Sequence, residues 1–305
     1  MIAGIDIGGT KIALGLVDDT GVVVTRADIS IEVQSGPESA RDRMLTILRK
    51  QIFENDVSLR GIGIACTGPV DPLTGELGDV NTLPGWQGWN PVLELADAFS
   101  VTAAMENDAD GAALGEARWG RGRHKRSMVS ITVGTGIGAG IILNGDVYRG
   151  ANHSHPEIGH HIVEPGGPLC TCGASGCWES LASGPALELW YAEQNPSDER
   201  RTGKEICALA RNNHAAAQRA VDHLAKYLGL GLSNVVSMLM PEVIALSGSV
   251  MQSADLLLDS IRATVRNNCR LVPVEKCEIA VSSLGANAGL IGAAQVWHSR
   301  FDPKP

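Results

Sequence analysis

Short apolar runs separated by glycine- and aspartate-rich turns open the chain. Two such runs flank Gly8-Gly9-Thr10, and a third follows the turn Asp18-Asp19-Thr20-Gly21. Short strands between tight turns are typical of an antiparallel meander, which is the structure predicted here. A helix is expected from about Ser35, because apolar residues then recur at helical spacing: Ala40, Met44, Ile47, Leu48 and Ile52.

The segment 127–147 repeats this opening pattern. When Gly134 is placed on Gly8, strand, glycine turn and second strand align, and the turn Asn144-Gly145-Asp146 falls near the position of Asp18-Asp19. Few identities survive, so the repeat is one of pattern. Two copies of a β-meander with helices predict two similar lobes that face one another, with a ligand-binding cleft between them.

The rest of the chain alternates between short apolar runs and helical periodicity. Strands are predicted at 61–66, 101–105, 243–249 and 277–281. Helices are predicted at 109–119, 204–212, 215–240, 256–268 and 286–298. Gly229 and Gly231 interrupt the periodicity of the longest of these helices, and Pro241 stops it.

Composition narrows the class of protein. With 305 residues, 44% of them apolar, the chain is an ordinary globular protein and long enough for two lobes. The net charge of −9 argues against nucleic acid or an anionic membrane as the main partner. No apolar run approaches the ~20 residues of a membrane helix, and no signal peptide is evident. The odd number of cysteines suits a reducing cytoplasm.

Two glycine turns offer phosphate-binding chemistry. In Asp6-Ile-Gly8-Gly9-Thr10-Lys11 the glycines permit close backbone approach to phosphate oxygens, and Asp6 could hold a hydrated Mg²⁺. The simpler alternative to phosphate binding is a tight hairpin in which the carboxylate of Asp6 only forms hydrogen bonds within the protein. The second turn, Gly134–Gly140, lacks a Walker lysine and is followed by strand instead of helix. This context argues against a dinucleotide-dependent oxidoreductase.

A carboxylate suited to general-base catalysis follows the predicted strand at 101–105. In Glu106-Asn107-Asp108, Asp108 would accept a proton from a substrate hydroxyl while Asn107 holds a neighbouring hydroxyl. Asn and Asp are also common helix N-caps, and a helix is predicted to begin here. Both interpretations stay open at this point.

Three cysteines and a histidine lie within a short stretch: His160, Cys170, Cys172 and Cys177. This ligand set matches a closed, tetrahedral and therefore structural zinc site, whereas Cys66, Cys207, Cys269 and Cys277 are scattered. Spacing alone leaves His153, His155 and His161 as competing ligands. Glu157 and Glu179 flank the predicted metal loop, which would orient both toward sugar hydroxyls. Solvated surface carboxylates are the alternative, and for either residue alone the favoured one. Trp86 and Trp89 would line the cleft or pack in the core.

Together, these motifs closely resemble those of the ROK family (repressor, ORF, kinase). The resemblance runs from residue 2 to about residue 295, and the motifs follow one another in the same order as in that family. The resemblance implies the actin-like ATPase, ribonuclease-H-like α/β fold, in which each of two lobes is a mixed sheet flanked by helices. The smaller lobe would comprise residues 1–118 and the C-terminal helix at about 286–305. The larger lobe would comprise 119–285, including the zinc loop 160–177.

The resemblance also assigns roles by position. It implies that Asp108 is the catalytic base and that the sugar is bound by Gly68, Asn81, Asn107, Asp108, Glu157, His160 and Glu179. It implies phosphate contacts in the two glycine turns and an adenosine contact at Gly248; with the turn residues considered above, the nucleotide set is Asp6, Gly8, Gly9, Thr10, Lys11, Gly134, Thr135, Gly136 and Gly248. His160 would also ligate zinc with the three cysteines.

The expected activity is ATP- and Mg²⁺-dependent phosphorylation of a hexose, with glucose as the acceptor. Two departures from the family pattern affect this expectation: Ser247-Gly-Ser replaces paired glycines, and His153-Ser-His-Pro replaces smaller residues before Glu157. An N-acetylmannosamine or N-acetylglucosamine kinase is the alternative of the same class, and a non-catalytic sugar sensor is the alternative of another class. Repressors of the family carry a DNA-binding segment for which no room is expected before residue 6. A cytoplasmic homodimer is expected.

Overall fold

The computed structural model describes residues 1–302, so the last three residues of the predicted C-terminal helix region lie outside the described chain. Among the described residues, no helix is long and apolar enough to cross a lipid bilayer. The chain forms two compact units. Unit 1 comprises Met1–Arg126, Gly140–Pro156 and the described residues from Ser283 onward, and unit 2 comprises Ser127–Ala139 and Glu157–Ser282.

Unit 1 is built on a five-stranded sheet with the order β3-β2-β1-β4-β7. Its strands are β1 (Ile2–Ile7), β2 (Lys11–Val17), β3 (Ala27–Ser30), β4 (Gly61–Cys66) and β7 (Thr102–Asn107). β1 pairs with β2 antiparallel and with β4 parallel, and β4 pairs with β7 parallel. The predicted strands at 61–66 and 101–105 are confirmed.

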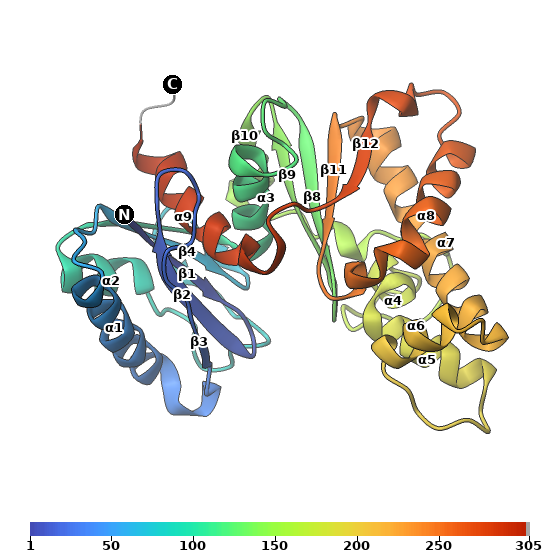
Figure 1. The fold of residues 1–305 in the computed structure, drawn as a ribbon, viewed down its shortest axis with the longest axis horizontal. Coiled ribbons are helices and arrows are strands. Elements are labelled where there is room, and N and C mark those ends of the chain that lie inside the picture. Colours follow the sequence, from blue (N-terminus) through green and yellow to red (C-terminus); the bar gives the residue numbers. More distant parts are fainter. Residues whose placement is uncertain (303–305) are drawn as a thin grey trace. The chain divides into compact units, whose positions relative to one another are not determined.

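Helices cover both faces of this sheet (Figure 1). They are α1 (Gly36–Glu54), α2 (Pro91–Phe99), α3 (Asp108–Trp119) and α9 (Ala288–Phe301). Apolar side chains of the sheet pack with α1 and α2 on one face. On the other face Gly4 and Gly63 stand where a Cβ atom would overlap the α9 backbone at Leu290 and Ala293. The missing side chains therefore let α9 lie directly against the sheet.

The third strand of the opening meander differs from the prediction. It begins at Ala27, whereas the apolar run after Gly21 makes only an isolated bridge between Val17 and Val23. The backbone N–H of Leu16 donates to Thr25 Oγ1 at 3.0 Å, so a side chain takes the position of a ladder partner. Pairing with β2 resumes only beyond this interruption.

The second sheet has the order β10-β9-β8-β11-β12, which matches the order of the first. Its strands are β8 (Met128–Val133), β9 (Ile137–Leu143), β10 (Asp146–Val147), β11 (Val243–Ser247) and β12 (Glu278–Val281). β11 pairs parallel with both β8 and β12. The repeat seen in the sequence pattern thus extends to the topology of the strands. A separate small hairpin joins β5 (Val70–Asp71) and β6 (Glu76–Leu77).

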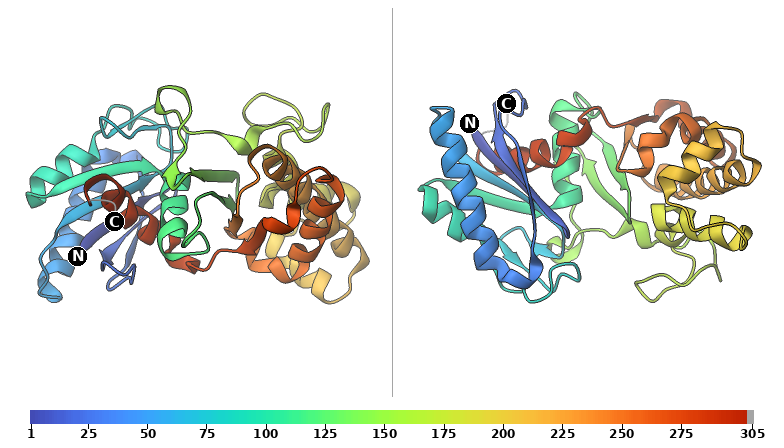
Figure 2. Two further views of the ribbon diagram at one scale, coloured as in Figure 1. Left: turned by 90° about the horizontal axis from the view of Figure 1, so that it is seen from above. Right: turned by 60° about the horizontal axis from the view of Figure 1, so that its bottom comes forward.

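Unit 2 is completed by helices that follow the cysteine-rich loop. They are α4 (Trp178–Ala182), α5 (Gly184–Gln194), α6 (Gly203–Arg211), α7 (Ala215–Leu239) and α8 (Ala254–Asn268). α7 runs unbroken through Gly229 and Gly231, although their spacing interrupts its apolar pattern. Side chains there would overlap Thr264 of α8 and the ring of Trp178, so these glycines permit close helix packing. Figure 2 shows α7 and α8 side by side.

The lobes expected from the resemblance remain a prediction, and the compact units divide the chain as follows. Residues 1–118 and the described part of 286–305 all belong to unit 1. The segment 119–285 is divided, because 119–126, 140–156 and 283–285 group with unit 1. With these additions unit 1 holds more residues than unit 2.

Candidate functional site

Candidate residues of unit 1 meet at the carboxyl edge of its parallel strands. Asp6 pairs in register with Ala65 of β4, and Ile7, Cys66 and Asn107 occupy the next level across the three strands. Parallel strands end at one edge, where open α/β sheets place their ligands. Gly68 joins this group, since an added Cβ would lie 2.8 Å from Asn107 Nδ2. The structure thus brings four predicted residues together: Asp6, Gly68, Asn107 and Asp108.

The two carboxylates at this edge influence one another. The pKa of Asp6 is raised from 3.8 to about 6, chiefly because the carboxylate is removed from water and secondly because of the negative charge of Asp108. The cations Lys11 and Arg26 act in the opposite direction but do not restore the ordinary value. Asp6 could hold a divalent cation, whose positive charge would relieve this repulsion.

We expect Asp6→Asn to stabilise the ligand-free protein near neutral pH. An unfolded Asp6 releases its proton around pH 3.8 and the folded one around pH 6, so the folded state loses stability as pH rises through that interval. Thermal denaturation at pH 4 and pH 7.5, without nucleotide or Mg²⁺, should show a higher Tm for the variant only at pH 7.5. Asp28, whose pKa is lowered to about 2 by Arg26, is the control: Asp28→Asn should lower Tm at pH 7.5. A variant Asp6→Asn no more stable than wild type at pH 7.5 would contradict the expectation.

The first glycine turn is held by its own backbone and by a neighbouring loop. Gly8 N–H donates to the carbonyl of Lys11 at 3.0 Å, and Gly9 packs against Thr82, the residue after Asn81. The Lys11 ammonium lies 3.4 Å from Asp28 Oδ1 and is well exposed. Asp28 also pairs with Arg26 at 2.7 Å. Lys11 is therefore held beside the turn by the carboxylate of Asp28, which lies outside the motif at 6–11.

Asn107 and Asp108 also have the capping role considered for them. The N–H of Ala109 donates to Asn107 Oδ1 at 2.9 Å and to Asp108 Oδ1 at 2.8 Å. Asn107 is the N-cap of α3, so its capping interpretation is confirmed. These bonds fix both side chains at the start of the helix.

Two ion pairs on either side of Asp108 were not foreseen. Glu106, which is 4% exposed, accepts two hydrogen bonds from Arg149, one of them from Nε at 3.2 Å. Asp110, which is 2% exposed, lies 3.0 Å from His155 Nδ1. The segment between Arg149 and His155 is thus tied at both ends to the β7–α3 junction. The acids Glu106 and Asp110 stand two residues before and after Asp108, which could have marked them in the sequence. No sequence pattern indicated their distant partners, Arg149 and His155.

In unit 2 the second glycine turn gathers further candidates. Gly134 N–H donates to the Gly136 carbonyl at 2.9 Å, and Ile137 N–H donates to Glu179 Oε2 at 2.9 Å. A side chain at Gly136 would overlap the Glu179 carboxylate. Gly248, with φ of +95°, packs on the backbone of Val133 just before this turn. The turn, Glu179 and Gly248 therefore lie together, whereas Thr135 is exposed at the tip.

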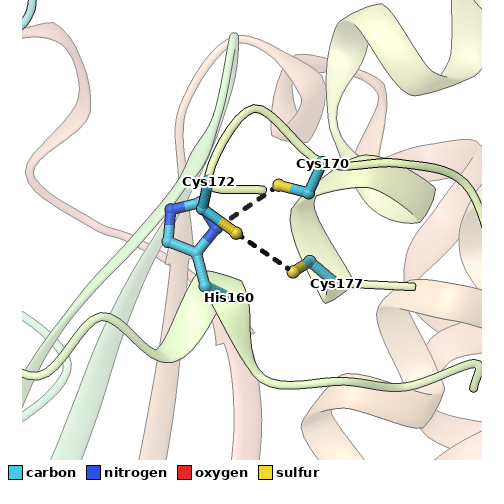
Figure 3. Close-up of side chains that lie close together, drawn as sticks. All are labelled: His160, Cys170, Cys172 and Cys177. Atoms are coloured by element: carbon cyan, nitrogen blue, oxygen red, sulfur yellow. Dashed lines mark hydrogen bonds between the residues drawn. The ribbon is translucent and has the colours of Figure 1, made fainter. Parts of the chain in front are cut away.

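His160, Cys170, Cys172 and Cys177 form one cluster (Figure 3). Their ligand atoms all lie within 4.8 Å of one another; His160 Nδ1 is 3.5 Å from Cys170 Sγ, and Cys172 Sγ is 3.5 Å from Cys177 Sγ. A tetrahedron with Zn–S bonds of ~2.3 Å has edges of about 3.8 Å. The donor set and its spacing thus fit zinc.

The backbone around this cluster connects it to the second glycine turn. Gly159, next to His160, packs on the carbonyl of Ile137, and Cys177 is the N-cap of α4, which carries Glu179. Glu157 is exposed at the start of the short helical turn that ends at His160. The cluster is therefore placed to hold Glu179 against the turn.

The competing histidines lie elsewhere. His161 Nδ1 is 2.5 Å from the Ile158 carbonyl and its ring packs on Trp178, while His155 pairs with Asp110 in unit 1. Among residues 1–302, only His160 groups with the three cysteines. The core interpretation of the tryptophans is also confirmed, since Trp86 and Trp89 are 1% and 7% exposed and pack edge to face.

Comparison with protein families gives one match along the described chain. A family model described as the ROK family covers residues 2–300. Among curated proteins, a glucokinase of Streptomyces coelicolor is 33% identical over 317 residues, covering 96% of each chain. A xylose repressor of Bacillus spizizenii is 29% identical and covers 98% of this chain but 77% of its own.

Solved structures agree in fold. A ROK hexokinase from Thermus thermophilus superposes with a TM-score of 0.84, at 31% identity and 99% coverage of both chains. A ROK family glucokinase from Streptomyces griseus, solved in complex with glucose and AMPPNP, has a TM-score of 0.81 at 30% identity, covering 97% of this chain and 98% of its own.

Proposed function

The chain belongs to the ROK family, and from this premise we propose that it is an ATP- and Mg²⁺-dependent kinase of hexose 6-hydroxyls, with glucose as acceptor. It has the actin-like ATPase fold of the ROK sugar kinases. Its relatives include both a glucokinase and a xylose repressor, so membership of the family alone does not decide between catalysis and regulation.

The proposal depends on one observation: the carboxylates of Asp6 and Asp108 lie near one another at the same edge of the sheet. Asp108 is held at the start of α3, where its Oδ1 accepts the Ala109 N–H, and its carboxylate would accept the proton of the sugar hydroxyl. Asp6, whose pKa is raised to about 6, suits the neighbourhood of a divalent cation. Mg²⁺ would neutralise developing charge on the transferred phosphoryl group. Asn107 and Gly68 would lie against the sugar.

The turns of unit 2 would bind the nucleotide. Gly134, Gly136 and Gly248 lie together and lack side chains that would block a phosphate or a base. Glu157, His160 and Glu179 would bind sugar hydroxyls, and the phosphate turn at Gly8–Lys11 would contribute backbone donors from unit 1.

We also propose that the Cys₃His cluster holds a structural zinc ion. All four ligand positions are taken by protein, so the metal would have no open position for activating water. Its role would be to fix the loop that carries His160 and is flanked by Glu157 and Glu179. The homodimer expected from the family remains a prediction, for which sedimentation equilibrium is the direct test.

A coupled ADP-release assay over a sugar panel tests the proposed activity. The panel should contain glucose, mannose, fructose, N-acetylmannosamine and N-acetylglucosamine. We expect the highest kcat/KM with glucose. A higher kcat/KM with either N-acetyl sugar would show that glucose is not the preferred acceptor, while the proposed phosphoryl transfer would stand. Saturable sugar binding by calorimetry without ADP release on any hexose would instead indicate a sensor.

A further inference from the structure

Two buried carboxylates flank Asp108 in unit 1, and both are paired with one distant segment of the chain. Glu106 accepts hydrogen bonds from the guanidinium of Arg149, from Nε at 3.2 Å and from Nη2. Asp110 Oδ2 lies 3.0 Å from His155 Nδ1. Since a carboxylate oxygen only accepts, Nδ1 of His155 carries the hydrogen of this bond. The chain is therefore anchored both before and after the proposed base.

The two anchoring residues are the ends of a closed loop, 149–155. The N–H of Gly150 donates to the Ser154 carbonyl at 2.8 Å, which closes the loop between its ends. At the tip, Asn152 and His153 have φ of +55° and +61°. Residues other than glycine keep this conformation only where their surroundings impose it. The 149–155 loop thus has a defined shape and presents its two anchors together.

The sheet supports the β7–α3 junction from one side only. β7 is the last strand in the order β3-β2-β1-β4-β7, so among the described strands it pairs with β4 alone. A strand at the edge of a sheet has neighbouring backbone on only one side to fix its position. The two pairs with the 149–155 loop add anchors that the sheet does not provide.

Stability alone does not account for these buried carboxylates. Glu106 and Asp110 are 4% and 2% exposed. Burial raises the pKa of Glu106, and the charge of Asp110 raises it too, although Arg149 lowers it. Within residues 1–302, Asp110 Oδ1 has no hydrogen-bond partner. Apolar residues in place of a buried ion pair are often neutral or stabilising, whereas a requirement on the position of Asp108 would explain why the charges are kept.

We propose that Arg149 and His155 are positioning residues for Asp108. By fixing the residues before and after the base, they would hold its carboxylate where it meets the sugar hydroxyl. Misplacement of a reacting group by about 1 Å can cost ~10²-fold in rate. The inference rests on the proposed function, because Asp108 acts as a base only if the chain transfers a phosphoryl group to a sugar.

Substitution of His155 tests the first anchor. His155→Ala removes the donor to Asp110, whereas His155→Asn keeps an N–H donor near the position of Nδ1. We expect His155→Ala to lower kcat at least about tenfold with the KM for ATP nearly unchanged, and His155→Asn to restore most of kcat. The matched control is His298→Ala, because His298 is also a buried histidine bonded through Nδ1 to an aspartate, Asp302. This control should lower Tm without lowering kcat.

The Arg149 pair allows a test that separates position from stability. Arg149→Met leaves the Glu106 carboxylate buried without its guanidinium, so this variant should lose both Tm and kcat. Glu106→Leu combined with Arg149→Met removes both charges. In this double variant Tm should recover, while kcat should stay at least about tenfold below wild type because the anchor is still missing.

Amide hydrogen exchange reports on the junction without any turnover. The Ala109 N–H donates to Oδ1 of both Asn107 and Asp108, so its exchange rate measures how firmly the start of α3 is held. In ligand-free protein this amide should exchange at least about tenfold faster in His155→Ala. In His155→Asn and in His298→Ala it should exchange at the rate of wild type.

The outcomes distinguish this inference from the proposed function. Wild-type kcat in His155→Ala, or equal loss of kcat in His155→Ala and His155→Asn, would overturn the positioning role while phosphoryl transfer stands. Recovery of kcat together with Tm in the double variant would also overturn it. If wild type phosphorylates no hexose, the proposed function fails. The exchange rate of Ala109 then decides whether the 149–155 loop holds the junction, and equal rates in all variants would overturn that as well.

Discussion

Asp108→Asn should lower kcat by ~10²–10⁴-fold while sugar affinity stays within a few-fold of wild type. The substitution removes the group that would accept the hydroxyl proton but keeps an oxygen that can cap α3 through the Ala109 N–H. Folding should therefore be preserved, which circular dichroism and thermal denaturation would check. The measurement is steady-state kinetics with glucose and ATP, together with calorimetric titration of glucose.

Asn107→Ala provides the contrast. Asn107 caps the same helix and would contact the sugar, so its loss should raise KM and cost about 1 kcal/mol of stability. A different partition between kcat and KM in the two variants would separate proton transfer from binding. Near-normal turnover of Asp108→Asn would remove Asp108 from the role of base.

Loss of the metal should have the second large effect. Elemental analysis should find about one zinc per chain, as a closed four-ligand site requires. Cys172→Ser removes one ligand from the exposed side of the cluster, so it should lower Tm by more than 10 °C. Sugar affinity should fall as well, because the loop lies between Glu157 and Glu179 and would hold both in place.

Cys207→Ser is the matched control for this experiment. Cys207 is also a thiol of unit 2, but it is buried in α6 outside the cluster. Its replacement should cost some stability and leave sugar affinity unchanged. Full sugar affinity in zinc-free protein would break the proposed coupling between the metal loop and the sugar site.

Much of the fold was predictable because local pattern and tertiary packing agree. The strand at 61–66 and the helix from Ala215 were placed closely, and the repeat of the opening pattern corresponds to equal strand order in both sheets. The prediction failed at 22–25, where valines follow a turn but a side-chain hydrogen bond from Thr25 interrupts the ladder. α2 was missed, although Asn90 followed by Pro91 is a good helix start.

The candidate site was predictable where one short motif carries its chemistry. His160 and the three cysteines belong to such a stretch, and the structure groups them. The partners of Lys11 and Glu106 were not predictable, because Asp28 and Arg149 are brought to them by sheet pairing and by a return of the chain from distant sequence. Such pairs depend on topology, which residue spacing does not contain.

The glycine face against α9 has a consequence for biosynthesis. β1 is the first strand of its sheet to be made, but the helix that covers this face begins only at Ala288. Until that helix emerges, Gly4 and Gly63 present bare backbone that other side chains do not shield. The packing of this sheet face can therefore be completed only after the segment that begins at Ala288 has been made.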